Sequence, residues 1–359
     1  MKPIPNRIDT INAFKEQGGQ VAAVLPIHYP RSLFRAFNIL PVEVWGPPGL
    51  ASTSGSTHLQ PYICSIAQNI LSFLKSGGLE ITDMIVSPHA CDSLQGLGSL
   101  LIDFVSPSQP VFPIYIPRER RESDIEFFTA ELRALFDQLS QRTPHTPDDA
   151  EIMECIQREE QADHLLADLY AKRKSLPLDD LTFYRLIRSR EYLPAETFIN
   201  LAGETLSAAG DYSFDRIPIL LSGIVPEPMG LFEVITELGA AVVGDDLASC
   251  GRRLYPTGQS SQPFQRMVER IIHAPPDPTR GNPLKERIEY LASMVNNTGA
   301  KGIVFYEVKF CEPELFDLPI LRAELGEAGI PSITIEVDIN DPLSHRVRTR
   351  LEAFLEMIQ

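Results

Sequence analysis

The 359-residue sequence has no long apolar run and only five cysteines. Its apolar segments, such as Ile217 to Gly223, fall well short of the roughly 20 residues needed to span a bilayer. The region from Met1 to Gly18 is polar and mixed in charge, without the basic start and apolar core of a secretory signal. We therefore expect a cytoplasmic protein, in which an odd number of cysteines argues against a disulfide framework.

Basic residues are also scarce, since 32 Lys and Arg face 48 Asp and Glu and the formal net charge is -16. Such a charge repels nucleic acid and anionic membranes, so we expect neither as a partner. The sequence contains no G-x-x-x-x-G-K-[ST] loop for phosphate and no G-x-G-x-x-G after a predicted strand. We therefore do not expect this chain to hydrolyse ATP itself or to bind a nicotinamide cofactor.

Two stretches of the chain, residues 1–141 and 213–359, alternate short apolar strands with amphipathic helices. This alternation predicts parallel sheets joined by right-handed crossovers. Residues 142–212 between them show helical spacing and no convincing strand. The sequence thus predicts an α/β protein of two doubly wound, Rossmann-like domains with a helical segment between them. The predicted strands are Val21–Leu25, Met84–Val86, Ile217–Leu221, Ala240–Val243, Ile303–Tyr306 and Ser332–Val337, and the clearest predicted helices are Ile63–Phe73, Asp124–Leu139 and Leu231–Leu238.

Three cysteines stand next to predicted elements. Cys91 follows the strand that ends at Val86, and Cys311 follows the strand that ends at Tyr306. Cys64 lies at the start of a predicted helix, where unpaired N–H groups and the helix dipole favour a thiolate. Because parallel α/β sheets bind ligands beyond the carboxyl ends of their strands, the three thiols could converge on a crevice between the two units. Three sulfurs would leave one position of a metal or cluster open.

The spacing of these cysteines matches no compact ligand motif such as C-x-x-C. For any one of them, ordinary burial as a small hydrophobic residue is the simpler interpretation. We keep that interpretation for Cys155, which falls inside an amphipathic helix. For Cys250 the sequence does not decide between simple burial and a role in a binding site. The Asp245-Asp246 pair after a strand could bind a cation, but capping the next helix is its simpler use.

Several separated segments resemble the cluster-bearing subunits of 2-hydroxyacyl-CoA dehydratases and of ATP-dependent benzoyl-CoA reductases. The resemblance covers nearly the whole chain, and its most specific part is Val308-Lys309-Phe310-Cys311-Glu312-Pro313-Glu314. Further matching segments are Leu318-Pro319, Ala328 to Pro331, Ile335 to Asp338, Ala90 to Ser93, Gly239 to Asp246 with Arg252, Pro41-Val42, and Arg348 to Met357.

The resemblance implies that Cys64, Cys91 and Cys311 are the three protein ligands of a four-iron four-sulfur (4Fe-4S) cluster, whereas Cys155 and Cys250 have no such counterpart. It implies a homologous cluster-bearing partner subunit and a separate ATP-hydrolysing activator iron-sulfur protein that delivers one low-potential electron. That electron would convert the thioester carbonyl of an (R)-2-hydroxyacyl-CoA into a ketyl radical, so that water leaves and an enoyl-CoA forms. The electron is then returned, which makes the dehydration redox-neutral.

One segment departs from the family pattern. Many members have a proline followed two positions later by glutamate, where this chain has Pro30-Arg31-Ser32. Ser32 cannot act as that carboxylate, so the chain is either the companion subunit or a subunit for a different acyl group. His28, Tyr29 and Ser32 are the candidate catalytic residues of this segment. A benzoyl-CoA reductase-type subunit, and a non-catalytic electron-transfer or metal-binding subunit, stay open as alternatives.

Overall fold

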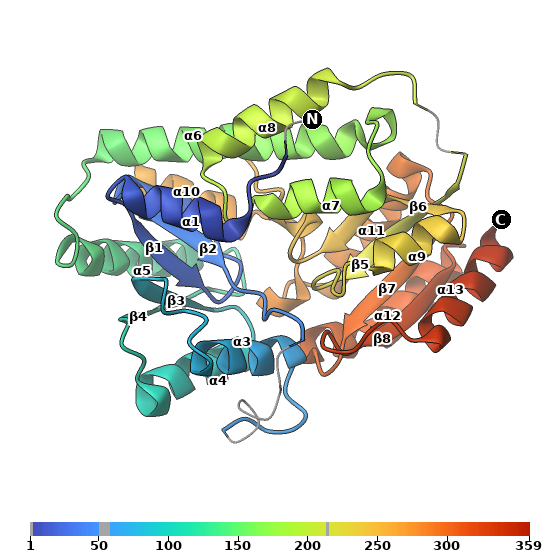
Figure 1. Cartoon of the computed structure of the whole chain (residues 1–359), viewed down its shortest axis with the longest axis horizontal. Helices are drawn as coiled ribbons and strands as arrows, with labels where there is room; N and C mark the ends of the chain where they lie inside the picture. Colours follow the sequence, from blue (N-terminus) through green and yellow to red (C-terminus); the bar gives the residue numbers. More distant parts are fainter. Residues whose placement is uncertain (1–2, 50–57, 213–214) are drawn as a thin grey trace.

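The computed structural model describes residues 3–49, 58–212 and 215–359 and contains two four-stranded, entirely parallel sheets flanked by helices (Figure 1). This confirms the predicted fold class. In the N-terminal sheet the strand order is β2-β1-β3-β4, with β1 (Gln20–Val24), β2 (Ile39–Glu43), β3 (Met84–His89) and β4 (Val111–Tyr115). Its helices are α1 (Arg7–Glu16), α2 (Arg31–Ala36), α3 (Ser65–Lys75), α4 (Asp92–Leu100) and α5 (Glu122–Ser140), and a short π-helical turn (Leu101–Val105) follows α4.

Two strands of this sheet, β2 and β4, were not predicted from the sequence. Each carries a proline, Pro41 in β2 and Pro113 in β4, which weakens the strand pattern. Proline is tolerated there because both are edge strands, where a missing backbone donor breaks no ladder on the outer side. Strand β3 also runs to His89, three residues beyond the predicted end at Val86.

The C-terminal sheet repeats the same arrangement, with the strand order β6-β5-β7-β8. Its strands are β5 (Ile217–Gly223), β6 (Ala240–Leu247), β7 (Gly302–Val308) and β8 (Ser332–Val337). The helices of this part are α9 (Leu231–Glu237), α10 (Pro263–Ile272), α11 (Leu284–Thr298), α12 (Glu312–Glu327) and α13 (His345–Ile358). One of them crosses over: α10 places Phe264, Met267 and Ile271 in the core of the N-terminal unit, against Phe128 and Leu132 of α5.

Between the sheets in sequence lie three helices, α6 (Asp149–Ala171), α7 (Asp180–Ser189) and α8 (Ala195–Ser207), and no strand occurs in the described residues 142–212. Asp148 caps α6 through a capping box with Glu151, and Pro147 directly precedes the cap. Helix α6 spans both units (Figure 1), because Ile152 packs into the N-terminal core and Leu166 into the C-terminal core.

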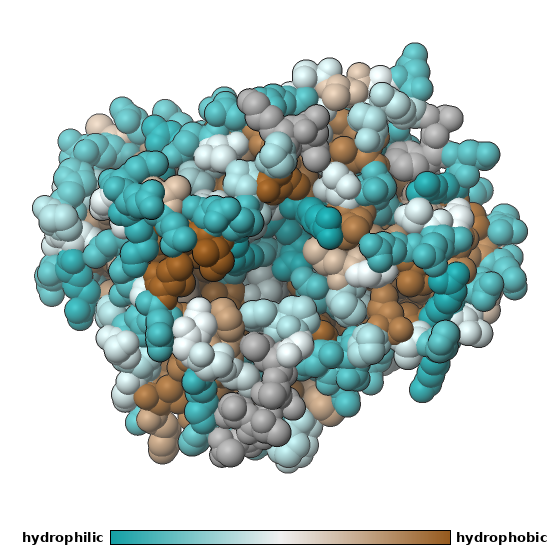
Figure 2. Space-filling view, viewed as in Figure 1, coloured by the Kyte–Doolittle hydropathy of each residue, from teal (hydrophilic) through white to brown (hydrophobic). Residues whose placement is uncertain are grey.

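The surface of the molecule agrees with the charged composition of the sequence. The face shown in Figure 2 carries mostly hydrophilic side chains, with apolar patches between them. No helix in the described ranges is long and apolar enough to cross a membrane.

The carboxyl ends of the two sheets face each other across an apolar cluster. Residues that follow β1 and β2, such as Ile27 and Trp45, share this cluster with Val225 after β5 and with Val308 at the end of β7. We call this zone the cysteine crevice, because Cys64 and Cys311 belong to the cluster and Cys91 packs against it. The fold therefore places the three predicted ligand residues where parallel sheets bind ligands.

Candidate functional site

Each of the three cysteines is the N-cap residue of a helix. Cys64 caps α3, Cys91 caps α4 and Cys311 caps α12. The sequence predicted a helix start for Cys64 alone and placed the other two on loops after strands. The signals for the other helix starts were present, because Asp92 follows Cys91, and Glu312-Pro313 follows Cys311.

The three thiols lie in one mostly buried environment. Cys64 and Cys311 are only 8% and 6% exposed, and their thiols are hydrogen-bonded to each other. Cys91 is partly exposed, and its thiol lies close enough to Cys64 to feel its charge. The prediction that three distant cysteines would converge is thus met in the geometry, although their role as ligands stays a prediction.

The first turns of α3 and α4 act on the pKa values of the two cysteines that precede them. The pKa of Cys64 is lowered by its hydrogen bond with Cys311 and also by the N–H groups of Ile66 and Ala67, against the effect of burial. Burial raises the pKa of Cys91 to about 12, and the N–H groups of Leu94 and Ser93 oppose that rise. These amides would favour a charged sulfur, as in a thiolate that binds a metal.

The donor set, three cysteines, is of the kind that holds an iron-sulfur cluster. Within the described ranges, no group of three or more His, Cys, Asp or Glu side chains is arranged to hold one metal ion. A tetrahedral zinc site, with Zn–S bonds of about 2.3 Å, would need its sulfurs within about 4 Å of one another. A cluster is held by cysteine thiolates spread over several irons, and its potential is set by hydrogen bonds to sulfur and by burial. Cys64, Cys91 and Cys311, at three helix starts beside one apolar cluster, supply the ligand type that such a cluster takes.

A cavity of about 210 Å³ opens beside Cys91, between the first turns of α4 and α12. Its lining combines Cys91 and Ser93 with Arg118, Thr279 and Phe316. This cavity gives a ligand a route from solvent to the edge of the cysteine crevice.

The two remaining cysteines do not join the site. Cys155, in α6, packs against the core of the N-terminal unit, as the burial interpretation predicted. Cys250 is fully buried in the core of the C-terminal unit, and its sulfur lies 3.3 Å from the hydroxyl of Ser249. For Cys250 the structure therefore favours burial.

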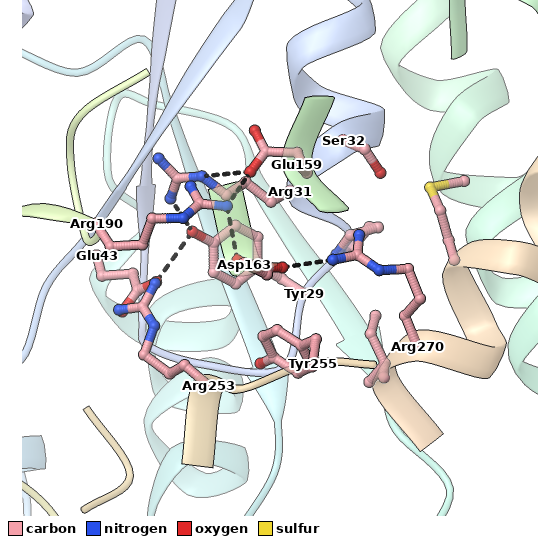
Figure 3. Close-up of a pocket in the computed structure, with 13 residues that line it drawn as sticks. Tyr29, Arg31, Ser32, Glu43, Glu159, Asp163, Arg190, Arg253, Tyr255 and Arg270 are labelled. Atoms are coloured by element: carbon pink, nitrogen blue, oxygen red, sulfur yellow. Dashed lines mark hydrogen bonds and ion pairs between the residues drawn. The ribbon is translucent and has the colours of Figure 1, made fainter. Parts of the chain in front are cut away.

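The three candidate catalytic residues lie apart from the thiols. His28 is fully buried in a left-handed backbone conformation, and its Nε2 lies 2.9 Å from Oδ2 of Asp277. Burial lowers the pKa of His28, whereas Asp277 opposes that shift. Asp277 also acts electrostatically on Cys91, so His28 is connected to the crevice through this carboxylate. Tyr29 and Ser32 instead line a separate cavity (Figure 3).

A buried ion network, missed in the sequence, supports the helix that Cys311 caps. Arg252 contacts Asp246 at 2.8 Å, Glu314 at 2.7 Å and Asp277 at 3.3 Å. Glu314 lies in the first turn of α12, so the network connects that turn to β6. The expectation that Asp245 and Asp246 cap a helix is wrong, because both lie within β6, where Asp246 pairs with Arg252 and Asp245 accepts hydrogen bonds from Tyr170 and Tyr184.

Comparisons with known proteins agree with this geometry. The family described as 2-hydroxyglutaryl-CoA dehydratase, D-component, matches residues 26–358. The beta subunit of (R)-phenyllactyl-CoA dehydratase from Clostridium sporogenes is 25% identical over 96% of this chain and 93% of its own length. The beta subunit of lactoyl-CoA dehydratase from Anaerotignum propionicum is 24% identical over the same shares. One of the subunits of benzoyl-CoA reductase from Thauera aromatica is 24% identical over 95% of this chain and 91% of its own length.

Proposed function

The chain belongs to the 2-hydroxyglutaryl-CoA dehydratase D-component family, and on that premise we propose that it is one subunit of a 2-hydroxyacyl-CoA dehydratase. The reaction would eliminate water from an (R)-2-hydroxyacyl-CoA and give an enoyl-CoA. The observation that carries the proposal is the meeting of Cys64, Cys91 and Cys311 at three helix starts around one apolar crevice.

We propose that these three cysteines hold a 4Fe-4S cluster. When bound, such a cluster supplies one-electron chemistry at low potential. The protein's own contribution would be to place the sulfurs of Cys64 and Cys91 at the starts of α3 and α4, where backbone N–H groups favour a charged sulfur. The apolar side chains of the crevice would keep water away from reactive species.

The three candidate catalytic residues take more distant roles in this proposal. His28, whose Nε2 lies 2.9 Å from Oδ2 of Asp277, would hold in place a carboxylate whose charge raises the pKa of Cys91. Tyr29 donates to Glu43 at 3.1 Å and accepts from Arg31 at 2.9 Å, so its hydroxyl is already engaged. Ser32 lines the same cavity as Tyr29, and substrate contact by either residue would have to occur there.

The names of the relatives support a multi-subunit enzyme. Two of them are beta subunits, so we propose that this chain pairs with a homologous cluster-bearing subunit. A separate ATP-hydrolysing activator would supply the electron, because the sequence has no phosphate-binding loop of its own. We propose the reducing cytoplasm as the location of this enzyme.

Reconstitution of the enzyme tests the proposal. The chain and its partner, purified without oxygen and supplied with activator and ATP, should dehydrate at least one of phenyllactyl-CoA, lactoyl-CoA and 2-hydroxyglutaryl-CoA. Reduction of benzoyl-CoA instead would favour the second candidate, which the benzoyl-CoA reductase relative supports. Failure with every 2-hydroxyacyl-CoA while the cluster transfers electrons would leave the non-catalytic alternative and would refute the dehydratase.

A further inference from the structure

A small cavity lies apart from the cysteine crevice and is lined by an unusual number of charged side chains (Figure 3). They come from elements far apart in sequence, including α2, β2, α6 and α10. All of them are at most 10% exposed at the side chain. The charged lining residues are Arg31, Arg190, Arg253, Arg270, Glu43, Glu159 and Asp163.

Each carboxylate of this cavity is paired with at least one arginine. Oε1 and Oε2 of Glu43 lie 2.7 and 2.8 Å from guanidinium nitrogens of Arg253. One oxygen of Glu159 contacts both Arg31 and Arg190. Asp163 pairs with Arg190 through Oδ1 and with Arg270 through Oδ2.

Some N–H donors of the arginines, in contrast, have no acceptor among the described residues. Nε and Nη1 of Arg190 are buried and have no hydrogen-bond partner among the described residues. Nε of Arg31 lies 3.3 Å from Glu159, but it also makes no hydrogen bond within the described ranges. Four guanidinium groups against three carboxylates leave one positive charge in excess on the lining. Each arginine has a carboxylate partner, and Arg270 also lies 3.7 Å from Glu160, so it is the unsatisfied donor atoms that require an acceptor. Buried donors without an acceptor are unfavourable, which suits the site to an additional anion.

The size of the cavity limits what that anion can be. Its volume is about 40 Å³, where a single water needs roughly 10–15 Å³ by the same measure. A carboxylate or carbonate group fits, whereas a whole acyl-CoA does not. Arginine also matches planar oxyanions well, because its donors form a flat fork.

We propose that this cavity binds a small planar oxyanion of the carboxylate class. The two unpartnered nitrogens of Arg190 would donate to the anion, and Ser32, on the cavity wall, would limit its size. This inference does not depend on the proposed dehydratase activity, because anion binding can be measured without cluster, partner or substrate. Ordered water alone is the competing content of the cavity.

Calorimetric titration of the purified chain with acetate tests the proposal directly. Acetamide serves as the uncharged control of the same shape, and sodium chloride holds the ionic strength constant. We expect acetate to bind at least about tenfold more tightly than acetamide, because hydrogen bonds to a charged acceptor are the stronger ones. Bicarbonate should compete with acetate. Equal and negligible binding of acetate and acetamide would show that the cavity holds water and would overturn the proposal.

A substitution that supplies the anion from the chain gives a second, independent test. Ser32→Glu should place a carboxylate among the arginines and raise the melting temperature by a few degrees over Ser32→Gln. It should also abolish acetate binding. Ser72 provides the matched control, because it is buried to a similar degree, 3% against 2% exposed, on a helix with apolar buried neighbours such as Ile70.

At Ser72 the order of the two variants should be reversed, with Ser72→Glu less stable than Ser72→Gln, since a buried charge there meets no excess of cations. A Ser32→Glu protein that melts below Ser32→Gln, as at Ser72, would contradict the proposal. Because each comparison is made between two variants of one position, the loss of stability from added bulk cancels.

Discussion

The two sheets have the same strand order, and each sends a cysteine from the end of its third strand to the start of a helix. Cys91 follows β3 and caps α4, and Cys311 follows β7 and caps α12. The second strands of the two sheets differ. A long connection after β2 brings Cys64 to the start of α3, whereas β6 carries Asp246 into the ion network with Arg252.

This difference shows how one topology serves two purposes. The N-terminal unit contributes two of the three thiols to the crevice, and the C-terminal unit contributes one thiol together with the ion pairs that fix its helix. Cys250, which follows β6 as Cys64 follows β2, is buried in a different core. Equivalent places in the sheets therefore predict a shared role for Cys91 and Cys311 but not for Cys64 and Cys250.

The largest expected effect tests that equivalence. Cys91→Ala and Cys311→Ala should each lose nearly all bound iron, because every ligand of a three-cysteine cluster is needed to hold it. Cys64→Ala should behave in the same way. Iron per chain after anaerobic purification is the measurement, and Cys250→Ala and Cys155→Ala are the controls that should keep it. Equal loss of iron from the controls would show that the ligands are wrongly assigned.

The ion network of the C-terminal unit predicts the next largest effect. Arg252→Met would remove one of the two arginines that Asp246 and Glu314 share, the other being Arg287, and would leave Asp277 paired with His28. It should lower the free energy of unfolding by about 3–5 kcal/mol. Urea denaturation measures this change. The control is Arg348→Met, whose exposed pair with Glu237 should contribute at most about 1 kcal/mol. Similar losses for the two variants would contradict a structural role for the buried network.

The first strands of the two sheets also end differently, and this predicts a smaller effect. β5 ends in Gly223, at a φ of 146°, and a Cβ at this position would overlap the carbonyl oxygen of Tyr306. Gly223→Ala should therefore lower the free energy of unfolding by about 3 kcal/mol. Gly239→Ala, at a φ of 78° with open space around it, should cost about 1 kcal/mol, since only the backbone is strained. If urea denaturation showed the same loss of stability for both variants, the contact between residue 223 of β5 and Tyr306 of β7 could not be the cause of the loss at Gly223.

The smallest expected effect is a pH dependence of stability that comes from Glu159 in α6, the helix that spans both units. Burial alone would raise the pKa of Glu159, but the charges of Arg190 and Arg31 lower it to about 2. A lowered pKa stabilises the fold above the unfolded value near 4.5, and this contribution is lost as pH falls through about 2. The stability difference between the wild-type chain and Glu159→Gln, measured by urea denaturation, should be constant above pH 6 and shrink below pH 4. A difference that does not change with pH would show that Glu159 is not held ionised.

The sequence predicted the parts of the fold that depend on local pattern. Apolar runs such as Ile303–Tyr306 and Ser332–Val337 correspond to observed strands because a buried parallel strand is apolar on both faces. Strands β2 and β4 were missed because their prolines hide the pattern, and only the edge position explains why they are tolerated. The local sequence cannot show which strand is at an edge.

For the site, the positions of Cys91 and Cys311 after predicted strands were sufficient to predict that both lie near one crevice. The ion network and the arginine-lined cavity were not predicted, because most of their partners are separated by tens to hundreds of residues, although Arg252 and Asp246 are only 6 positions apart. Glu43 and Arg253, for example, are 210 positions apart in the sequence. Charged residues of this kind look like surface residues in a sequence, and only the packing of α6 and α10 against the N-terminal unit buries them.

Metal analysis of the anaerobically purified chain tests the central claim most directly. The three converging cysteines predict about four iron and four sulfide per chain, with the broad absorption of thiolate-bound clusters. Both should be lost in Cys64→Ala, Cys91→Ala and Cys311→Ala. Stoichiometric zinc without sulfide, or a chain that binds neither metal under any reconstitution, would contradict a cluster in the cysteine crevice.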